Sequence, residues 1–156
     1  MSSHAKLVGV VEENAREILS RHGLEGEYLV VRELRFPHGR ADVVLYGLCE
    51  GVAVMPIAVE VRREVVSGVD ILATINEKMR GIYDYAFTHV YIAVPSIRTR
   101  VEDLVRMHLS ELGYGLLKLE DNRVKIVEEA KPKKPPGEDY YRVASQGVLY
   151  FTCSPL

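Results

Sequence analysis

Hydrophobic and polar positions along this chain follow two spacings, one typical of helices and one typical of strands. Apolar residues recur every three or four positions in residues 6–21, 70–87 and 100–112, which predicts three amphipathic helices. Short runs rich in Val, Ile and Leu, bounded by turn residues, predict strands. These runs are residues 28–36, 43–46, 52–61, 89–95, 115–119 and 123–128.

The order of these elements predicts an α/β domain. Turns at residues 37–39 and 47–51 join the first three strands into an antiparallel meander. Pro56 lacks a backbone N–H group, so it predicts an edge or a bulge within the third strand. The helix at 70–87 then leads into an apolar, buried strand, which together with the third strand makes a right-handed βαβ unit. The last two strands form a hairpin that turns at Asp121-Asn122.

The length and the change in composition near the C-terminus divide the chain into three parts. Its 156 residues are enough for one hydrophobic core, which we place in residues 1–130. Residues 131–138 form a stiff linker rich in Pro and Lys. Residues 139–156 form a tail, in which 147–152 is strand-like and is expected to pair with a sheet edge. That edge belongs either to a second copy of the chain, which implies a homodimer, or to the same domain.

Charge and composition exclude several classes of protein. A net charge of -2 excludes a strongly basic nucleic-acid binder, although a local basic groove is compatible with it. Two cysteines without paired spacing, no signal peptide and no long apolar run predict a cytoplasmic protein with no membrane span. The histidines and cysteines lack the spacing of zinc, serine or cysteine hydrolases. Few amide side chains and an excess of Arg over Lys favour a thermophilic source.

Two carboxylates interrupt apolar strands and are the main candidates for chemistry. Asp42 directly precedes the run at 43–46, and Glu60 lies near the end of the run at 52–61. A carboxylate in such a strand is costly unless a partner or a metal compensates its charge. Two of them on adjacent strands repel each other and favour a divalent cation between them. The alternative is a structural arrangement in which Asp42 forms a salt bridge with Arg40 or Arg62.

The two segments that carry these acids, Gly-Arg-Ala-Asp-Val-Val at 39–44 and Ile-Ala-Val-Glu-Val-Arg at 57–62, resemble the PD-(D/E)xK nuclease superfamily. The resemblance implies a restriction-endonuclease-like fold. This fold has an αβββαβ core with a mixed sheet flanked by helices, here followed by a C-terminal hairpin and a strand-like tail. It also implies that Asp42, Glu60 and the carbonyl of Val61 bind Mg²⁺ or Mn²⁺, which are ions that prefer oxygen ligands.

Three further residues are assigned catalytic roles by the resemblance. Arg62 stands where the family usually has Lys, and because Arg is always protonated it cannot act as a base, although it can bind phosphate. Lys78, on the second helix, can take over the role of that Lys, as in some families of this fold. Glu12 matches the Glu that these nucleases often carry on their first helix. The alternative for Lys78 is a helix-edge side chain that extends to solvent, and the alternative for Glu12 is a solvated charge at the edge of its helix. Glu33 is expected at the surface.

The function that the resemblance implies is hydrolysis of phosphodiester bonds by a metal-dependent DNA endonuclease. The metal lowers the pKa of its bound water and stabilises charge on the phosphate. The alternative is a nuclease-fold module that has lost catalysis and serves in nucleic-acid binding or as a scaffolding subunit. Arg62 favours the alternative, whereas Asp42 and Glu60 favour the nuclease.

Overall fold

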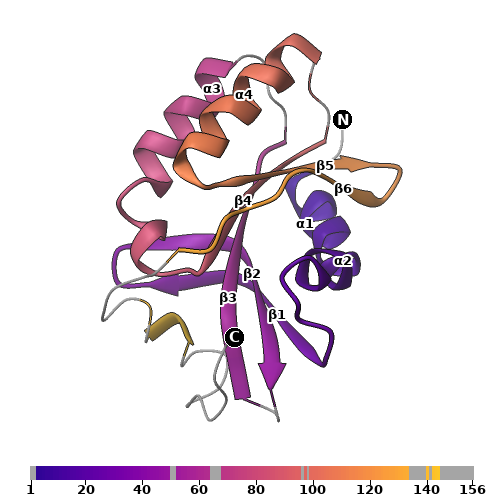
Figure 1. Cartoon of the computed structure of the whole chain (residues 1–156), viewed down its shortest axis with the longest axis vertical. Helices are drawn as coiled ribbons and strands as arrows, with labels where there is room; N and C mark the ends of the chain where they lie inside the picture. The colour runs from indigo at the N-terminus through magenta and orange to yellow at the C-terminus, as the bar shows by residue number, and fades with distance from the viewer. Residues whose placement is uncertain are drawn as a thin grey trace.

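The computed structural model describes residues 3–49, 52–63, 68–95, 97, 99–133, 140 and 142–144. Six strands form one mixed sheet, with helices on both of its faces (Figure 1). The strands are β1 (Tyr28–Phe36), β2 (Gly39–Cys49), β3 (Val52–Val61), β4 (His89–Val94), β5 (Gly115–Glu120) and β6 (Arg123–Glu128). The helices are α1 (His4–Glu13), α2 (Ala15–Ser20), α3 (Gly68–Thr74) and α4 (Thr99–Leu112), with a π-helical turn η1 (Ile75–Met79) and a 3₁₀ turn η2 (Tyr83–Tyr85).

The strands lie in the sheet in the same order as in the chain. β1, β2 and β3 are antiparallel neighbours, β3, β4 and β5 run parallel, and β6 returns antiparallel to β5. A parallel neighbour requires a crossover, which α3, η1 and η2 provide between β3 and β4, and α4 provides between β4 and β5. The prediction of a mixed α/β domain with helices flanking the sheet is therefore confirmed.

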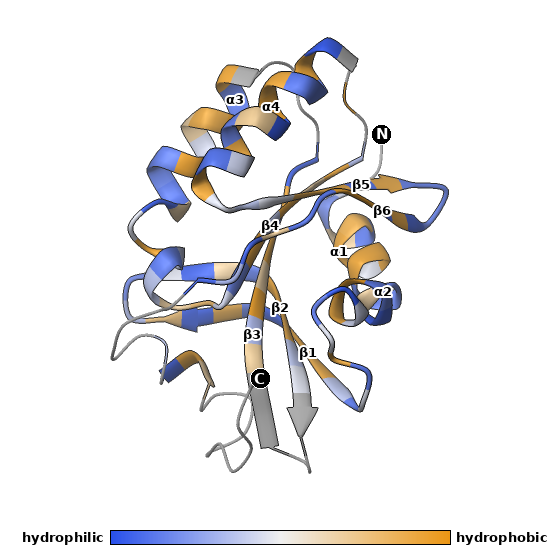
Figure 2. Ribbon diagram, in the orientation of Figure 1, coloured by the Kyte–Doolittle hydropathy of each residue, from blue (hydrophilic) through white to orange (hydrophobic). Residues whose placement is uncertain are grey.

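Each face of the sheet has its own hydrophobic core. On β2, Val43 and Leu45 pack with α1 and α2, whereas Val44 and Tyr46 pack with α3, η1, η2 and α4. β4 is covered on both faces, and all six of its residues are buried. In Figure 2 the central strands are accordingly hydrophobic, while the outer faces of the helices carry hydrophilic residues.

Two of the three predicted helices are interrupted. The helix expected at 6–21 divides at Asn14, whose side-chain amide donates hydrogen bonds to the carbonyls of Val10 (2.8 Å) and Asn122 (3.0 Å). The helix expected at 70–87 is α-helical only through Thr74. The Arg80 N–H then bonds the carbonyl of Ile75, five residues back, and Gly81 has a φ of 76°. The helical spacing was correct, but tertiary contacts and a glycine in the left-handed region override it.

The meander departs from the prediction at its second turn. Residues 47–49, expected in that turn, continue β2 to Cys49. Pro56 pairs with Tyr46 and Val54 pairs with Gly47, so Met55, with a φ of 49°, is the extra residue of a β-bulge. The bulge that Pro56 predicts is thus confirmed. The hairpin turn is confirmed as well, since Asp121 and Asn122 both have positive φ (51° and 61°), as a type I′ turn requires.

The alternation of side chains along β1 and β2 breaks at one position. Val31 and Leu34 are three residues apart, and yet both pack against the core of α3 and α4, as do Ala41 and Val44 on β2. Strict alternation would place such pairs on opposite faces of the sheet. Between them lie Glu33, with a φ of 50°, and Asp42, two residues that are not paired in the register. The break removes Asp42 from the regular pleat of the sheet.

The beginning of the tail packs on its own domain. Val143 and Ala144 are buried, and Val143 belongs to the core of α3 and α4. The carbonyl of Val143 accepts a hydrogen bond of 2.5 Å from the hydroxyl of Tyr46. The strand-like segment 147–152 lies outside the described residues, and so does most of the linker. Within the part of the chain that the structure describes, the helices are all too short or too polar to cross a membrane.

Glu33 is strained, because a non-glycine residue rarely adopts a positive φ. We expect Glu33→Gly to preserve or raise the free energy of unfolding by up to about 1 kcal/mol, and Glu33→Val to lower it by about 1–3 kcal/mol. Chemical denaturation measures both changes. Lys125, which is exposed on the edge strand β6, is the control position. There the Val variant of the protein should be at least as stable as the Gly variant. If the Val variant were at least as stable as the Gly variant at position 33 as well, strain at Glu33 would be contradicted.

Candidate functional site

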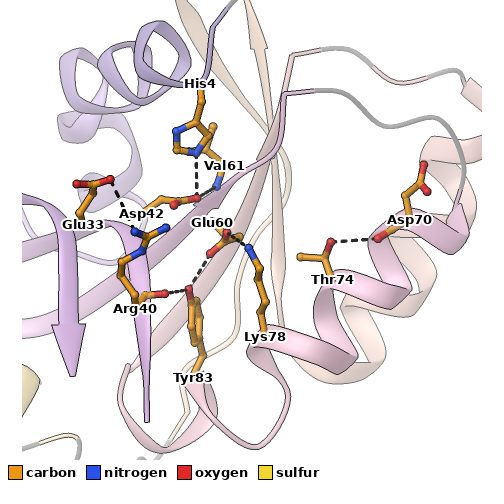
Figure 3. A network of polar contacts seen from close by, with 10 residues as sticks. All are labelled: His4, Glu33, Arg40, Asp42, Glu60, Val61, Asp70, Thr74, Lys78 and Tyr83. Carbon is orange, nitrogen blue, oxygen red and sulfur yellow. Dashed lines mark hydrogen bonds and ion pairs between the residues drawn. The ribbon is translucent and has the colours of Figure 1, made fainter. Parts of the chain in front are cut away.

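A polar pocket opens where β2, β3, η1 and the start of α1 meet. Its volume is about 580 Å³. The lining residues are His4, Arg40, Asp42, Glu60, Val61, Arg62, Arg63 and Lys78. Asp42 and Glu60 form its buried floor, with only 7% and 4% of their surfaces exposed. Figure 3 shows that the side chains of His4, Lys78 and Tyr83 converge on these two carboxylates from three different elements.

Asp42 is held by a backbone donor of the neighbouring strand. The N–H group of Val61 donates a hydrogen bond of 2.8 Å to Oδ2 of Asp42. Nε2 of His4, the first residue of α1, lies 3.3 Å from the same oxygen. Because the break in the pleat at Glu33 and Asp42 turns this carboxylate out of the regular alternation, it can reach the end of β3. Asp42 is therefore fixed in place although it is nearly buried.

Each oxygen of Glu60 has a partner outside the pair of acids. The hydroxyl of Tyr83 donates a hydrogen bond of 2.7 Å to Oε2, and Nζ of Lys78 lies 4.0 Å from Oε1. Tyr83 also lies 2.6 Å from the carbonyl oxygen of Arg40, so its single proton is shared between two acceptors. Edge-on contacts with Phe36 and Phe87 fix the ring of Tyr83.

The two carboxylates disfavour each other's charge. Burial raises the pKa of Glu60 to about 7, and the charge of Asp42 and a hydrogen bond with it act in the same direction. The hydrogen bond from Tyr83 and the charge of Lys78 lower this pKa but do not outweigh burial. A bound divalent cation is one way to compensate such a pair, and protonation of Glu60 is the other.

Positive side chains surround the two acids. Arg40, Arg62, Arg63 and Lys78 line the pocket, so four cationic groups face two carboxylates. The N–H group of Arg62 donates to the carbonyl of Ala93 on β4 (2.9 Å), which fixes the backbone just after Glu60. Arg62 lines the pocket, so an anion bound there can contact it. The protein is slightly acidic as a whole, but this pocket attracts anions.

Most of the residues that the sequence singles out meet in this pocket. Asp42, Glu60, Val61, Arg62 and Lys78 all line it, although they come from β2, β3, the segment after β3 and η1. The π-helical turn brings Lys78 within reach of Glu60.

Glu12 and Glu33 lie elsewhere. Glu12 is not among the residues lining the pocket and instead forms an ion pair of 2.8 Å with Nε of Arg32. The reason is geometric: α1 points its first residue at Asp42, and Glu12 lies eight residues further along the helix, about 12 Å at the rise of an α-helix. Glu33 is exposed, as expected, and lies 4.0 Å from Arg40.

Sequence reasoning missed His4, Tyr83 and Arg40 as members of this site. His4 has no motif around it, and only the direction of α1 brings it to Asp42. Tyr83 falls within the helix predicted at 70–87, whereas the 3₁₀ turn directs its hydroxyl to Glu60. Arg40 was considered only as a partner of Asp42. A Tyr or His close in sequence to a buried core segment gives no signal that it contacts an acid 20 or more residues away.

The part of the chain that the structure describes contains no group of three or more His, Cys, Asp or Glu side chains arranged to hold a metal ion. The oxygen ligands at the pocket floor are the two carboxylates, and Val61, the third expected ligand, also lines the pocket. Mg²⁺ and Mn²⁺ accept such oxygen donors and complete their coordination with water, so two acids are chemically sufficient. The residues present therefore fit a hard divalent cation.

Comparisons with known proteins identify a fold but not a family. No family model matches the chain, and no curated protein matches it. A solved structure with a similar fold is the SPO1766 protein of unknown function from Silicibacter pomeroyi. It is 19% identical, with a TM-score of 0.57, and the match covers 94% of this chain and 84% of that chain. At this level of identity the similarity shows a shared fold alone.

The raised pKa of Glu60 predicts a specific dependence of stability on pH. The folded protein keeps a proton on Glu60 up to about pH 7, whereas the unfolded chain releases it near pH 4.5. The free energy of unfolding contributed by this group therefore falls as pH rises from 4.5 to 7. We expect Glu60→Gln, which cannot ionise, to be more stable than the wild type at pH 8 by about 2 kcal/mol and to differ little at pH 5. Chemical denaturation in EDTA measures this difference, and an equal effect at both pH values would contradict it.

Proposed function

We propose that this protein is a metal-dependent DNA endonuclease with a restriction-endonuclease-like core of the PD-(D/E)xK type. The observation that carries the proposal is the pair Asp42 and Glu60, which lie buried side by side at the floor of a pocket lined by cations. The element order from α1 to β4, with three antiparallel strands followed by a crossover to a parallel strand, supports the same assignment. The phosphate of a nucleic acid is an anion that suits this combination of acids and cations, and we take DNA as the substrate to test first.

The roles of the residues follow from their positions. Asp42 and Glu60, with the carbonyl of Val61, would hold Mg²⁺ or Mn²⁺, and the hydrogen bond from the Val61 N–H keeps Asp42 in place. When bound, such a cation would lower the pKa of its water and would compensate negative charge on the phosphate. Arg62 and Lys78 bind phosphate oxygens and stabilise the negative charge that develops on them. Tyr83 positions Glu60 through its hydroxyl group.

A second candidate is an inactive nuclease-fold module that binds nucleic acid or acts as a scaffolding subunit. The observation that favours it is that Glu60 already has a hydrogen bond from Tyr83 and a nearby ammonium of Lys78, while Arg62 cannot act as a base. In this case the cations of the pocket bind phosphate without cleaving it.

A homodimer belongs to the proposal, because cutting both strands of a duplex is commonly done by a symmetric pair. Light scattering on the full chain and on a chain truncated after Ala130 tests whether residues 131–156 mediate it. The truncated chain also removes Val143 and Ala144 from the core, so its folding must be checked by circular dichroism.

Cleavage assays with Mg²⁺ or Mn²⁺ on plasmid, linear duplex and single-stranded DNA test the proposal. We expect Asp42→Asn and Glu60→Gln to lower the cleavage rate about 100-fold or more, because each removes an anionic ligand. Glu17→Gln, which alters an exposed carboxylate of α2 outside the pocket, is the control and should leave the rate unchanged. Calorimetric titration with Mn²⁺ should show that binding weakens in the two pocket variants. Activity that survives Glu60→Gln belongs to a contaminant or to another site.

Arg62→Lys separates the active enzyme from the inactive module. If Arg62 stabilises charge on the phosphate, Lys at this position should preserve or raise cleavage, since it restores the residue usual in the resembled family. An inactive module shows no cleavage with either residue but still binds DNA. Electrophoretic mobility shifts alongside the cleavage assay distinguish the two cases, and a large loss of cleavage in Arg62→Lys would contradict a purely electrostatic role.

A further inference from the structure

A second, smaller hollow adjoins the acidic floor on the side of α1. Its volume is about 250 Å³, and its lining residues are His4, Ala5, Val8, Arg32, Glu33 and Asp42. It shares His4 and Asp42 with the main pocket, so a ligand that reaches across Asp42 contacts both spaces. The chemistry of the two spaces differs, and this difference identifies the kind of group that the smaller one accepts.

The smaller hollow is not an anion site. Its only Arg, Arg32, is already paired with Glu12 at 2.8 Å, and the carboxylates of Glu33 and Asp42 also face the space. The main pocket, in contrast, has an excess of cations over carboxylates. A phosphate is therefore attracted to the main pocket and repelled by the smaller one. The group that suits the smaller hollow therefore carries no negative charge, as is true of a neutral ring.

The lining of the smaller hollow is suited to a flat ring. Ala5 and Val8 provide apolar surface from one side of α1, and the imidazole of His4 and the guanidinium of Arg32 provide planar groups. Unstacked bases are commonly bound on such planar side chains. The ion pair with Glu12 restricts the guanidinium of Arg32, and Glu33 offers an exposed acceptor for an amino group. The volume is below that typical of sites for larger ligands, which suits a single ring system.

We propose that this hollow is a subsite for one nucleobase, next to the nucleotide whose phosphate binds over Asp42 and Glu60. The inference rests on the proposed function and adds a substrate preference to it. A base can enter the hollow only after it leaves the helical stack, so the preferred substrate is single-stranded DNA or a frayed or distorted duplex. Glu12 then has a positioning role, because it holds Arg32 against the base.

The test measures binding of single-stranded oligonucleotides in Ca²⁺, which replaces Mg²⁺ so that cleavage does not interfere. A set of oligonucleotides with one abasic position each retains every phosphate and removes one base at a time. For the wild type we expect one abasic position to weaken binding about tenfold, with smaller effects at the others. Fluorescence anisotropy measures the dissociation constants.

Ala5→Trp is the diagnostic variant, because the larger side chain fills the hollow from an exposed position on α1. It should bind the intact oligonucleotide about tenfold more weakly and should no longer distinguish it from the abasic one. Ala73→Trp, the same change at an exposed position of α3, is the matched control and should bind as the wild type does. Arg32→Ala, at an exposed residue, is a second variant if Ala5→Trp fails to fold, and it should also lose the dependence on the base.

The outcomes for the subsite and for the nuclease are separable. Equal affinities of the wild type for intact and abasic oligonucleotides at every position would overturn the subsite, whether or not the protein cleaves DNA. Base-dependent binding without any cleavage would support the subsite in an inactive module and count against the nuclease. A wild-type dependence on the base that persists in both Ala5→Trp and Arg32→Ala would place the base elsewhere and overturn the proposal.

Discussion

The hydrogen bond from the Val61 N–H to the Asp42 carboxylate is the contact on which the site depends. It joins β2 to the end of β3, and it fixes one of two buried carboxylates within reach of the other. A buried carboxylate is tolerated only where donors or a counter-ion compensate its charge. Val61 and His4 do so for Asp42, whereas Glu60 relies on Tyr83 and Lys78 and keeps a raised pKa. The fold thus holds two carboxylates that repel each other when both are ionised, and a divalent cation between them can relieve this repulsion.

Irregular backbone conformations position the side chains around the two carboxylates. Glu33 has a positive φ opposite Asp42, and the π-helical turn η1 carries Lys78 toward Glu60. Both irregularities cost free energy relative to a regular strand or helix, and both adjoin the pocket. The large cores on either side of the sheet give the domain enough stability to keep them. A strained residue beside a pocket is a recognised sign of a functional site.

The arrangement of charge around the acids divides the surface into two kinds of space. Cations of β2, of the segment after β3 and of η1 line the main pocket, whereas the adjoining hollow under α1 has its single Arg neutralised by Glu12. In the subsite proposed above, the phosphate of a nucleotide would lie in the main pocket and its uncharged base in the hollow. The net charge of -2 conceals this division, because the total charge says nothing about where charges lie.

The sequence by itself determined the strands, the hairpin turn at Asp121 and Asn122, the bulge near Pro56, and Asp42 and Glu60 as the candidate acids. These features depend on local properties: the alternation and length of apolar runs, the φ that a turn requires, the missing N–H of proline, and the anomaly of a carboxylate inside a strand. Only the tertiary structure decided that helix 70–87 breaks, that His4 and Tyr83 reach the acids, and that Glu12 pairs with Arg32. Such outcomes depend on the direction in which one element meets another, and residues distant in sequence carry no local signal of that direction.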